Sequence, residues 1–286
     1  MVETTSRGGS DRLPPLFRWA GSKRQIVETL AKAWPGEDHR YVEPFAGSAC
    51  LFFHLRPASA LLADINTELV TTYCVLADDP DGVYAKLTKI GPASREVYYS
   101  LRAQEPHLLG PTDRAARFVY LNRFCFNGLY RTDRTGRFNV PYGGAKTGSL
   151  PDGPTLTTYA QALRAAEIKA ADFEETVADV QVGDFVYLDP PYAVATEWRR
   201  GLHYTQDAFA LDDMDRLIQS LRSIASTGAI FLLSYADSPE GRSIREEWNW
   251  VPITVRRSIA GSAFKRVRRQ ELLISNMPLQ KQGSMQ

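Results

Sequence analysis

Short apolar runs alternate with longer stretches of helical periodicity along the 286 residues of this chain. The short runs are rich in β-branched and aromatic residues and predict strands at residues 41–45, 58–63, 168–173, 185–188, 229–234, 251–259 and 269–275. Apolar positions at helical spacing predict helices over residues 26–33, 50–55, 114–124 and 211–224, and a broken helical stretch over 66–109. Strands that alternate with helices in this way predict an α/β fold.

The apolar run at residues 185–188 ends in Asp189-Pro190-Pro191-Tyr192. Two prolines forbid a continuing strand or helix, so the acid is predicted at the C-terminal end of a buried parallel strand. Ligands of open α/β sheets bind in the crevice outside those ends. An acidic side chain, a proline carbonyl and an aromatic ring therefore meet at the predicted site of chemistry. The alternative is a stiff turn with a packed tyrosine, and other segments must decide between the two.

A βαβ unit is predicted upstream of this motif. A strand at 41–45 leads through the small-residue turn Ala46-Gly47-Ser48-Ala49 into a helix, and the next strand ends at Asp64. An acid in that position accepts hydrogen bonds from ribose hydroxyls. The turn has one glycine and the chain has no G-x-x-x-x-G-K-[ST] sequence, so no pyrophosphate or triphosphate cradle is predicted. A nucleoside cofactor without phosphate, S-adenosylmethionine, fits best, although such units also occur without a ligand.

Two further segments carry residues suited to a cofactor. Lys23 lies in a glycine-broken turn before a helix, where a lysine either contacts an anionic ligand group or is simply solvated. Asp172 and Phe173 end the strand at 168–173. The acid is placed to accept a hydrogen bond from an adenine amino group with the ring beside it. Both residues are equally suited to starting the next helix.

Arginines and aromatic residues alternate between residues 114 and 138. The pattern predicts a helix over 114–124, a loop at Asn127-Gly128 and a β-hairpin whose turn contains residues 133–136. Guanidinium groups bind phosphates or guanine edges, and apolar side chains touch or wedge between bases, so a projecting hairpin of this composition suits nucleic acid. The alternative is a solvated charged helix face over an aromatic core.

Composition narrows the class of protein. Hydrophobic residues make up 44% of the chain and charged residues 23%, with a net charge of +1, which is typical of a globular protein without general affinity for polyanions. DNA contact is therefore predicted to be local, over a few base pairs. The cysteines, Cys50, Cys74 and Cys125, have no metal-ligand spacing and favour reduced thiols in a cytoplasm.

Other features are expected to be missing. No apolar stretch approaches the length of a membrane span, and the sequence indicates no metal site. Residues 1–15 and 279–286 are polar and are expected to form a disordered leader and a disordered tail. We expect a monomer, or a dimer on DNA.

Five ordered motifs resemble the Dam family of DNA adenine-N6 methyltransferases. They span residues 16–276 and read F-R-W-A-G-S-K, V-E-P-F-A-G-S-A, L-L-A-D-I-N, Y-L-N-R-F-C-F-N-G-L-Y-R…G-R-F-N-V-P-Y-G and G-D-F-V-Y-L-D-P-P-Y. The resemblance implies a Rossmann-like seven-stranded methyltransferase sheet with a helical target-recognition insertion that carries a β-hairpin. It also implies an S-adenosylmethionine-binding catalytic domain at residues 16–76 and 165–278, with the DNA target-recognition insertion at 77–164.

The resemblance implies roles for individual residues as well. Those expected to line the S-adenosylmethionine site are Trp19, Lys23, Phe45, Gly47, Asp64, Asp172, Phe173 and Asp189. Those expected to contact double-stranded DNA are Arg18, Arg123, Asn127, Leu129, Arg131, Asn139 and Pro141. The chain departs from the family pattern in the recognition segment, where Phe126 replaces a tyrosine and Gly144 and Lys146 stand where an arginine is often found. These departures bear on the target sequence more than on the chemistry.

The expected reaction is transfer of a methyl group from S-adenosylmethionine to adenine N6 in a short target such as GATC. Asp189 and the Pro190 carbonyl would accept the two hydrogens of the exocyclic amine, and Tyr192 would stack on a base flipped out of the duplex. The alternatives are cytosine-N4 methylation and a DNA-binding homologue that has lost catalysis. RNA is less favoured as substrate, because the chain shows no aromatic sheet module for single-stranded RNA.

Overall fold

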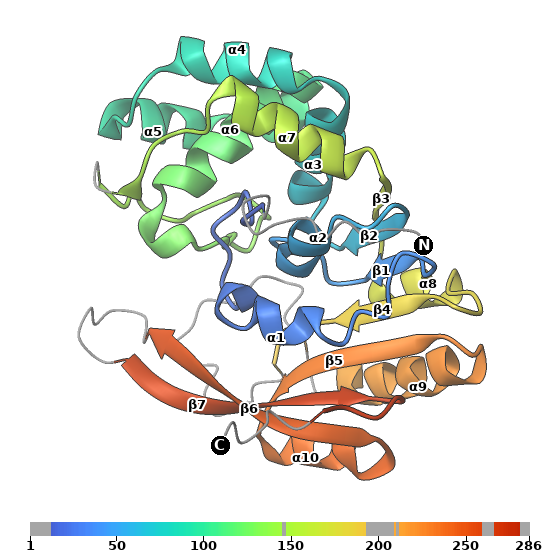
Figure 1. The fold of residues 1–286 in the computed structure, drawn as a ribbon. Coiled ribbons are helices and arrows are strands. Elements are labelled where there is room, and N and C mark those ends of the chain that lie inside the picture. The colour runs from blue at the N-terminus through green and yellow to red at the C-terminus, as the bar shows by residue number, and fades with distance from the viewer. Residues whose placement is uncertain (1–12, 145–146, 193–208, 210–211, 259–265, 281–286) are drawn as a thin grey trace, which may run out of the picture.

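The computed structural model describes residues 13–144, 147–192, 209, 212–258 and 266–280. Within these residues a 7-stranded sheet has the order β3-β2-β1-β4-β5-β7-β6 (Figure 1). Its strands are β1 (Tyr41–Glu43), β2 (Ala60–Asp64), β3 (Ala166–Ala170), β4 (Phe185–Leu188), β5 (Ile230–Ala236), β6 (Asn249–Ser258) and β7 (Arg266–Ser275). Each of them matches a predicted strand. The α/β fold with a seven-stranded methyltransferase sheet is thereby confirmed.

Strand direction defines where ligands bind. The strands β3, β2, β1, β4 and β5 run parallel, whereas β7 pairs antiparallel with both β5 and β6. From β1 the chain passes first to β2 and β3 on one side and later to β4 and β5 on the other. The strand order therefore reverses between β1 and β4, and the crevice outside the carboxyl ends of these strands is the expected ligand site.

Helices cover the sheet and also form a group of their own (Figure 1). The α-helices are α1 (Val27–Ala31), α2 (Cys50–Leu55), α3 (Thr67–Asp78), α4 (Pro80–Ile90), α5 (Arg95–Ala103), α6 (Pro111–Phe124), α7 (Gly153–Leu163), α8 (Phe173–Ala178), α9 (Asp212–Ser226) and α10 (Pro239–Ile244). Short 3-10 helices are η1 (Lys23–Gln25), η2 (Pro106–Leu108), η3 (Phe126–Gly128) and η6 (Arg245–Glu247).

Side-chain caps begin several helices. Asn66 accepts from the Glu68 and Leu69 amides at the start of α3, and Asp152 accepts from the Thr155 amide in α7.

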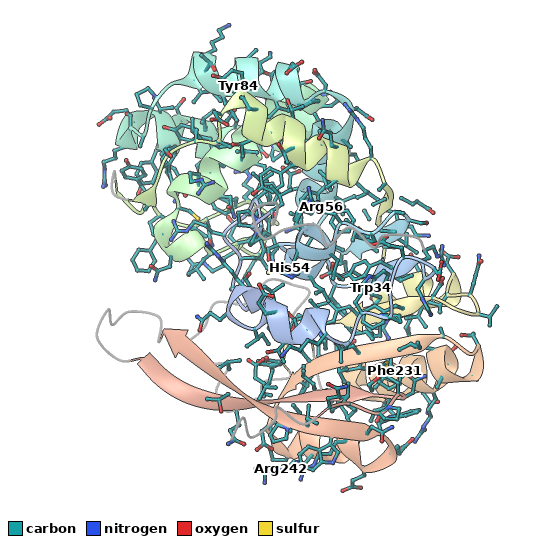
Figure 2. All side chains as sticks on the ribbon, in the orientation of Figure 1. Trp34, His54, Arg56, Tyr84, Phe231 and Arg242 are labelled. Carbon is teal, nitrogen blue, oxygen red and sulfur yellow. The ribbon has the colours of Figure 1, made fainter. Side chains whose placement is uncertain are left out.

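Alternating strand residues divide the core into two layers. Along β4, Phe185 belongs to one layer and Val186 to the other. Trp34 packs edge-on against Phe185 with ring centroids 5.3 Å apart, and on the opposite face Phe231 packs edge-on against Trp248 at 5.0 Å (Figure 2). The first layer is covered by α1, α2 and α3, and the second by α8, α9 and α10. Both faces of β1, β2, β4 and β5 are thus buried, as a parallel sheet requires, whereas the edge strand β3 is partly exposed.

The helices α4, α5, α6 and α7 gather at one end of the molecule (Figure 1). Of these, α4, α6 and α7 pack on α3, and α5 packs on α6; α3 itself packs on β2 and β3. Their buried side chains belong to the same core layer as those of α1 and α2. The predicted boundary between residues 76 and 77 therefore falls inside α3, and the separate roles of the two predicted domains remain a prediction.

The predicted recognition hairpin has less strand structure than the sequence pattern indicates. An isolated antiparallel bridge joins Thr132 to Phe138, and the Asn139 amide donates to the Arg131 carbonyl at 3.0 Å. Pro141 has no amide to extend this ladder. The chain therefore doubles back as a short hairpin, with the predicted turn closed by the Gly136 amide, which donates to the Asp133 carbonyl at 3.0 Å.

Residues 13–15 and 279–280, which were predicted to belong to a disordered leader and tail, lie within the described structure. Leu13 packs against the core, and the Tyr159 hydroxyl of α7 donates to the Pro14 carbonyl at 2.6 Å. Leu279 packs against the same core layer. Apolar contacts and a hydrogen bond thus hold residues predicted to be disordered, whereas residues 1–12 and 281–286 lie outside the described part of the chain.

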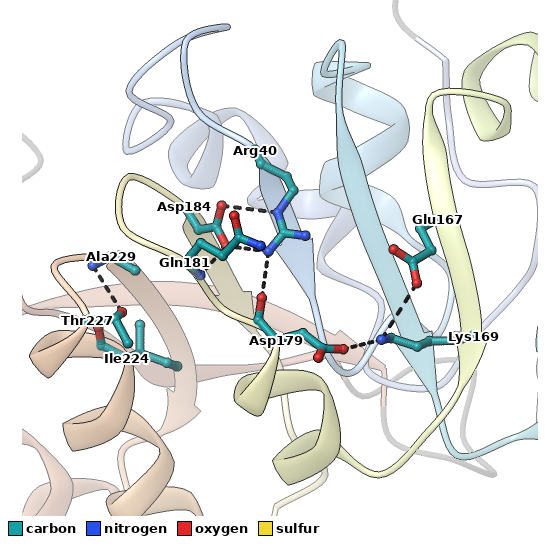
Figure 3. Close-up of polar contacts among 9 residues, drawn as sticks. All are labelled: Arg40, Glu167, Lys169, Asp179, Gln181, Asp184, Ile224, Thr227 and Ala229. Carbon is teal, nitrogen blue, oxygen red and sulfur yellow. Dashed lines mark hydrogen bonds and ion pairs between the residues drawn. The ribbon is translucent and has the colours of Figure 1, made fainter.

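A polar cluster joins strands at the end of the sheet opposite to the crevice (Figure 3). Arg40, before β1, donates to both carboxylate oxygens of Asp184, before β4, at 3.1 and 2.6 Å. It also donates to the Asp179 carbonyl at 2.8 Å, and the Gln181 amide donates to Asp184 at 2.8 Å. Asp184 is only 4% exposed, so its charge depends on Arg40 for compensation.

Removing this carboxylate should destabilise the fold. Asp184→Asn keeps the shape but leaves Arg40 without its anionic partner, so we expect the free energy of unfolding to fall by about 2–3 kcal/mol. Urea denaturation is the measurement. Asp237→Asn is the control, because Asp237 pairs with Arg242 at the surface and water screens that pair, so its loss should be much smaller. Equal losses of unfolding free energy in the two variants would show that the buried pair stabilises the fold no more than the surface pair does.

Candidate active site

A large cleft lies at the carboxyl ends of β1 and β4, with a cavity volume of about 830 Å³. Residues of the segment before α1, the turns after β1, β2 and β4, and the recognition hairpin line it. All residues predicted to serve catalysis or the cofactor lie on its wall, namely Trp19, Lys23, Phe45, Gly47, Asp64, Asp172, Phe173, Asp189, Pro190 and Tyr192. The fold thus brings together residues that are far apart in the sequence, in a volume suited to a small-molecule ligand.

Asp189 follows β4 directly, where two prolines end the strand. Its Oδ1 accepts hydrogen bonds from Lys23 Nζ at 2.5 Å and from Ser234 Oγ at 2.9 Å. Within the described part of the chain, both side-chain hydrogen bonds to this carboxylate fall on the same oxygen. The arrangement leaves Oδ2 to accept from a ligand in the cleft.

Lys23 is the cation that compensates this carboxylate. It lies in η1 and is 6% exposed. Its Nζ also donates to the Gly21 carbonyl at 3.2 Å and to Tyr192 Oη at 3.5 Å, and lies 3.9 Å from Glu271 Oε2. The anion that Lys23 contacts is therefore the protein's own Asp189. Since Lys23 also lines the cleft, its role toward a cofactor remains a prediction.

Three acids share the cleft, and burial raises the pKa of each above its usual value: Glu43, Asp64 and Asp189. For Asp189, Lys23 and Ser234 oppose this rise in pKa because they stabilise the charged form. For Glu43, burial raises the pKa well above its usual value, and the hydrogen bond that Tyr41 donates opposes this rise. The cleft thus combines two buried acids, of which Asp189 is compensated by a cation, Lys23.

Backbone amides hold the acid after β2. Asp64 Oδ2 accepts from the Gly47 amide at 2.8 Å, and Oδ1 accepts from the Asn66 amide at 2.9 Å. Gly47 has a φ of +47°, and a Cβ there would lie 2.9 Å from Trp19 Nε1. Tyr73 Oη secures the same turn by donating to the Gly47 carbonyl at 2.8 Å. Only glycine lets this turn lie so close to the indole ring.

One wall of the cleft is aromatic. Phe45 and Phe173 stack with ring centroids 5.1 Å apart at an interplanar angle of 27°. Next to them, Asp172 accepts from the Glu174 amide at 2.9 Å, which caps α8, and from Arg216 Nη2 of α9 at 2.6 Å. Asp172 therefore starts a helix, as the alternative interpretation expected, and also lines the cleft, while its contact with an adenine remains a prediction.

The sequence is similar to those of known proteins. The family described as D12 class N6 adenine-specific DNA methyltransferase matches the chain over residues 19–259. The chain belongs to this family. The type II methyltransferase M1.LlaDCHI of Lactococcus lactis subsp. cremoris is 32% identical to it over 271 residues, which cover 92% of this chain and 95% of that protein. The retron Ec67 DNA adenine methylase of Escherichia coli is 35% identical over 252 residues, covering 87% and 86%.

A further relative is the DNA adenine methylase of Haemophilus influenzae, which is 31% identical over 264 residues, covering 91% of this chain and 92% of that protein. The resemblance to the Dam family is thus confirmed. The chain is an adenine-specific DNA methyltransferase, and its substrate is DNA.

Residues of this methyltransferase that are predicted to contact DNA lie around α6 and the hairpin. Asn122 binds Arg18 twice, through the Arg18 amide at 3.0 Å and the Arg18 carbonyl at 2.8 Å. Arg18 Nη1 donates to the Arg123 carbonyl at 3.3 Å. Across the hairpin, Arg131 Nε donates to Asn139 Oδ1 at 2.7 Å. These contacts fix the residues relative to one another, and their contact with DNA remains a prediction.

The other predicted DNA contacts lie in the loop between α6 and the hairpin or just beyond it. Asn127 is exposed and has a φ of +54°, a conformation that asparagine tolerates better than most residues. Leu129 packs partly against the core. Pro141 is exposed, and its carbonyl accepts from the Phe126 amide at 2.9 Å. Lys146 lies outside the described residues.

Several residues of the cleft escaped the sequence analysis. Tyr130 of the hairpin lines the cleft and stacks on Trp19 with ring centroids 5.6 Å apart at 20°. Ser234 on β5 and Glu271 on β7 lie beside the Asp189 and Lys23 pair. For Ser234 the available signal was a lone polar residue within an apolar strand, whereas Glu271 follows the polar residues 268–270 and gives no such signal. Arg216 on α9 gave no signal in the sequence, because a charged residue is expected on the exposed face of an amphipathic helix.

The described residues contain no group of three or more His, Cys, Asp or Glu side chains arranged to hold a metal ion. No helix in that part of the chain is long and apolar enough to cross a membrane. All three cysteines are free, and burial raises the pKa of Cys50 to about 12 and that of Cys125 to about 11. Neither thiol is therefore an activated nucleophile.

The turn at Gly47 allows a test of the geometry of the cleft. Gly47→Ala presses a methyl group against Trp19 in a strained backbone region, so we expect methyl transfer to fall about tenfold to a hundredfold. Gly183→Ala is the control. Its φ of +83° carries similar strain, but no heavy atom lies within 4 Å of the added Cβ. Both variants are assayed for methyl transfer to DNA, and equal activities would contradict the close approach at Gly47.

Proposed function

We propose that this methyltransferase transfers a methyl group from S-adenosyl-L-methionine to N6 of an adenine that is flipped out of a short duplex target such as GATC. The observation that carries the proposal is the carboxylate of Asp189, held at the end of β4 by Lys23 and Ser234 with Oδ2 left for the cleft. An exocyclic amine needs such an acceptor before its nitrogen attacks a methyl group. We expect the enzyme to act on DNA in the cytoplasm.

The donor set of the cleft fits S-adenosyl-L-methionine. Asp64 uses one acceptor position on each oxygen for a backbone amide and keeps others for ribose hydroxyls. Phe45 and Phe173 offer apolar rings beside the Asp172 carboxylate, a combination suited to an adenine ring and its amino group. The Gly47 amide is already bonded to Asp64, so it is not available to cradle a phosphate. Bound here, the cofactor supplies an electrophilic methyl group on a sulfonium.

Asp189 and Pro190 activate the amine. The lone pair of adenine N6 is delocalised into the ring, so the free amine is a weak nucleophile. When Asp189 Oδ2 and the Pro190 carbonyl accept its two hydrogens, the nitrogen moves toward tetrahedral geometry and its lone pair turns toward the methyl group for in-line transfer. The methylated nitrogen then loses one proton, for which Asp189 is the adjacent base.

Tyr192 supports the flipped base. A base stacked in a duplex cannot reach this pocket, so the target adenine must leave the helix. The Tyr192 ring packs edge-on against Tyr235 with centroids 5.2 Å apart, and its hydroxyl accepts from Lys23 at 3.5 Å. Held in this way, the ring offers a stacking face worth about 1–3 kcal/mol to the extruded base.

Target reading is assigned to the recognition hairpin. Arg131 and Asn139 bond to each other across it, so they present one combined polar edge. Arg131 keeps further N–H donors for a guanine edge, and the Asn139 amide group keeps its own donors. We infer that this pair reads base edges, while Arg18, beside Arg123, contributes to the first base of the target.

The proposed reaction is tested by mapping methylated bases on a plasmid from cells that express this chain. We expect N6-methyladenine within one short motif. Asp189→Ala should reduce it by about a hundredfold to a thousandfold, because N6 loses its acceptor. Methylation without a common motif would contradict the assigned reading, and equal methylation by the variant would exclude Asp189 from the chemistry.

Replacing the hairpin arginine should change specificity rather than affinity alone. Arg131→Ala should weaken discrimination against a single mismatched base pair by about 1–3 kcal/mol. Competition between cognate and mismatched duplexes measures it. Arg137→Ala is the control, because Arg137 is exposed and pairs with Glu105 at 2.5 Å. It should weaken binding to all sequences alike, and the same pattern in both variants would rule out base reading by Arg131.

A further inference from the structure

Two buried hydroxyl groups form a hydrogen-bonded chain that ends on Asp189. Ser234 on β5 is 0% exposed, and Tyr187 on β4 is 2% exposed. Tyr187 Oη lies 3.1 Å from Ser234 Oγ, and Ser234 Oγ lies 2.9 Å from Asp189 Oδ1. Because β4 and β5 are neighbours in the sheet, the chain connects the core between them to the wall of the cleft.

The direction of these hydrogen bonds follows from their chemistry. An ionised carboxylate only accepts, so Ser234 donates its single proton to Asp189. Ser234 Oγ then has only lone pairs to offer, and Tyr187 is the donor to it. Burial raises the pKa of Tyr187 well above its usual value, so the phenol keeps its proton across the neutral range. Hydrogen bonds in such a chain polarise one another, so both hydroxyls stabilise negative charge on Oδ1.

The same contacts fix the orientation of the carboxyl group. An aspartate side chain rotates easily about its terminal bond, because that torsion is broad and nearly two-fold. Lys23 approaches Oδ1 from η1, and Ser234 approaches the same oxygen from β5. Two donors from different elements hold the carboxylate plane at one angle, whereas one donor alone would leave that plane freer to turn about the terminal bond.

We infer that Ser234 is a positioning residue for methyl transfer, supported by Tyr187, because it holds Asp189 with Oδ2 presented to the amine of the target base. The inference rests on the proposed function of Asp189. It adds to that function two residues that act through Asp189 rather than on the reacting atoms.

Removal of Ser234 should also change how Asp189 titrates. The charged and titratable groups around this carboxylate are Lys23, Glu43, Cys50, Tyr187, Tyr192 and Glu271. Ser234 is an uncharged donor, so Ser234→Ala changes the hydrogen bonding without changing the net charge of this cluster. The variant loses a bond to the ionised form, so the pKa of Asp189 should rise further. Since transfer needs the ionised acid, activity should begin to fall at a higher pH as the solution is acidified.

The test is the pH profile of kcat for Ser234→Ala, with binding of S-adenosyl-L-methionine and duplex measured separately. We expect kcat at neutral pH to fall about tenfold, the acid limb to move to higher pH, and both affinities to change by less than about twofold. Ser234→Thr keeps the hydroxyl and should restore kcat and the acid limb. Tyr187→Phe should shift both in the same direction as Ser234→Ala, by a smaller amount.

Ser275→Ala is the matched control. Ser275 is also fully buried in this sheet, on β7, but its hydroxyl donates to the Phe231 carbonyl and not to a group in the cleft. It should leave the acid limb unchanged. Three results would overturn the inference but leave the proposed function standing: a wild-type pH profile in Ser234→Ala, the same shift in Ser275→Ala, or no rescue by Ser234→Thr.

Two other outcomes are distinct from these. If the wild-type enzyme methylates no DNA, the proposed function and the inference fall together. If Ser234→Ala does not fold, as urea denaturation would show, Tyr187→Phe decides by the same readouts. If the acid limb and kcat of that variant are unchanged, the inference that the two hydroxyl groups position Asp189 is overturned.

Discussion

A buried ion pair between Lys23 and Asp189 is the constraint on which the rest of the site depends. The two side chains are 6% and 20% exposed, and their charged atoms lie 2.5 Å apart. Such a pair is stable only when further hydrogen bonds satisfy both partners, which the Gly21 carbonyl and Ser234 do here. Loss of either partner would leave a buried charge without compensation. This requirement joins residues 166 positions apart in the sequence, so the cleft is complete only when the segment before α1 folds over the end of β4.

Trp19 joins the recognition hairpin to the same cleft. Its indole stacks on Tyr130 of the hairpin and lies against the turn at Gly47, whose amide holds Asp64. The helices of the predicted insertion also share one core layer with the sheet. The part of the chain assigned to reading DNA is therefore in direct contact with the part assigned to the chemistry. A displacement of the hairpin would therefore move the wall of the cleft, because the rings of Tyr130 and Trp19 are stacked on each other.

Local sequence patterns predicted β2, β4 and β5 because each is a short apolar run between residues that end it. The same logic located Asp189, since two prolines end β4 beside it, and located Asp64 after β2. Ser234 could not be found in this way, because its role depends on the pairing of β5 with β4. Alternating arginines and aromatic residues overstated the strand content of the hairpin, since the pattern does not count missing amides such as that of Pro141. The end of the predicted leader was wrong because Leu13 packs against the core and the Tyr159 hydroxyl donates to the Pro14 carbonyl, contacts that the polar composition of the leader does not indicate.

The most direct measurement of the central claim is transfer of a labelled methyl group by the purified chain. The enzyme is incubated with methyl-tritiated S-adenosyl-L-methionine and unmethylated duplex DNA, and the DNA is digested to nucleosides. The account predicts that the label appears in N6-methyldeoxyadenosine and is lost in Asp189→Asn, which keeps the shape of the side chain but not its charge. Label in deoxycytidine, or equal label from the variant, would contradict the assignment of Asp189 as the acceptor that activates adenine N6.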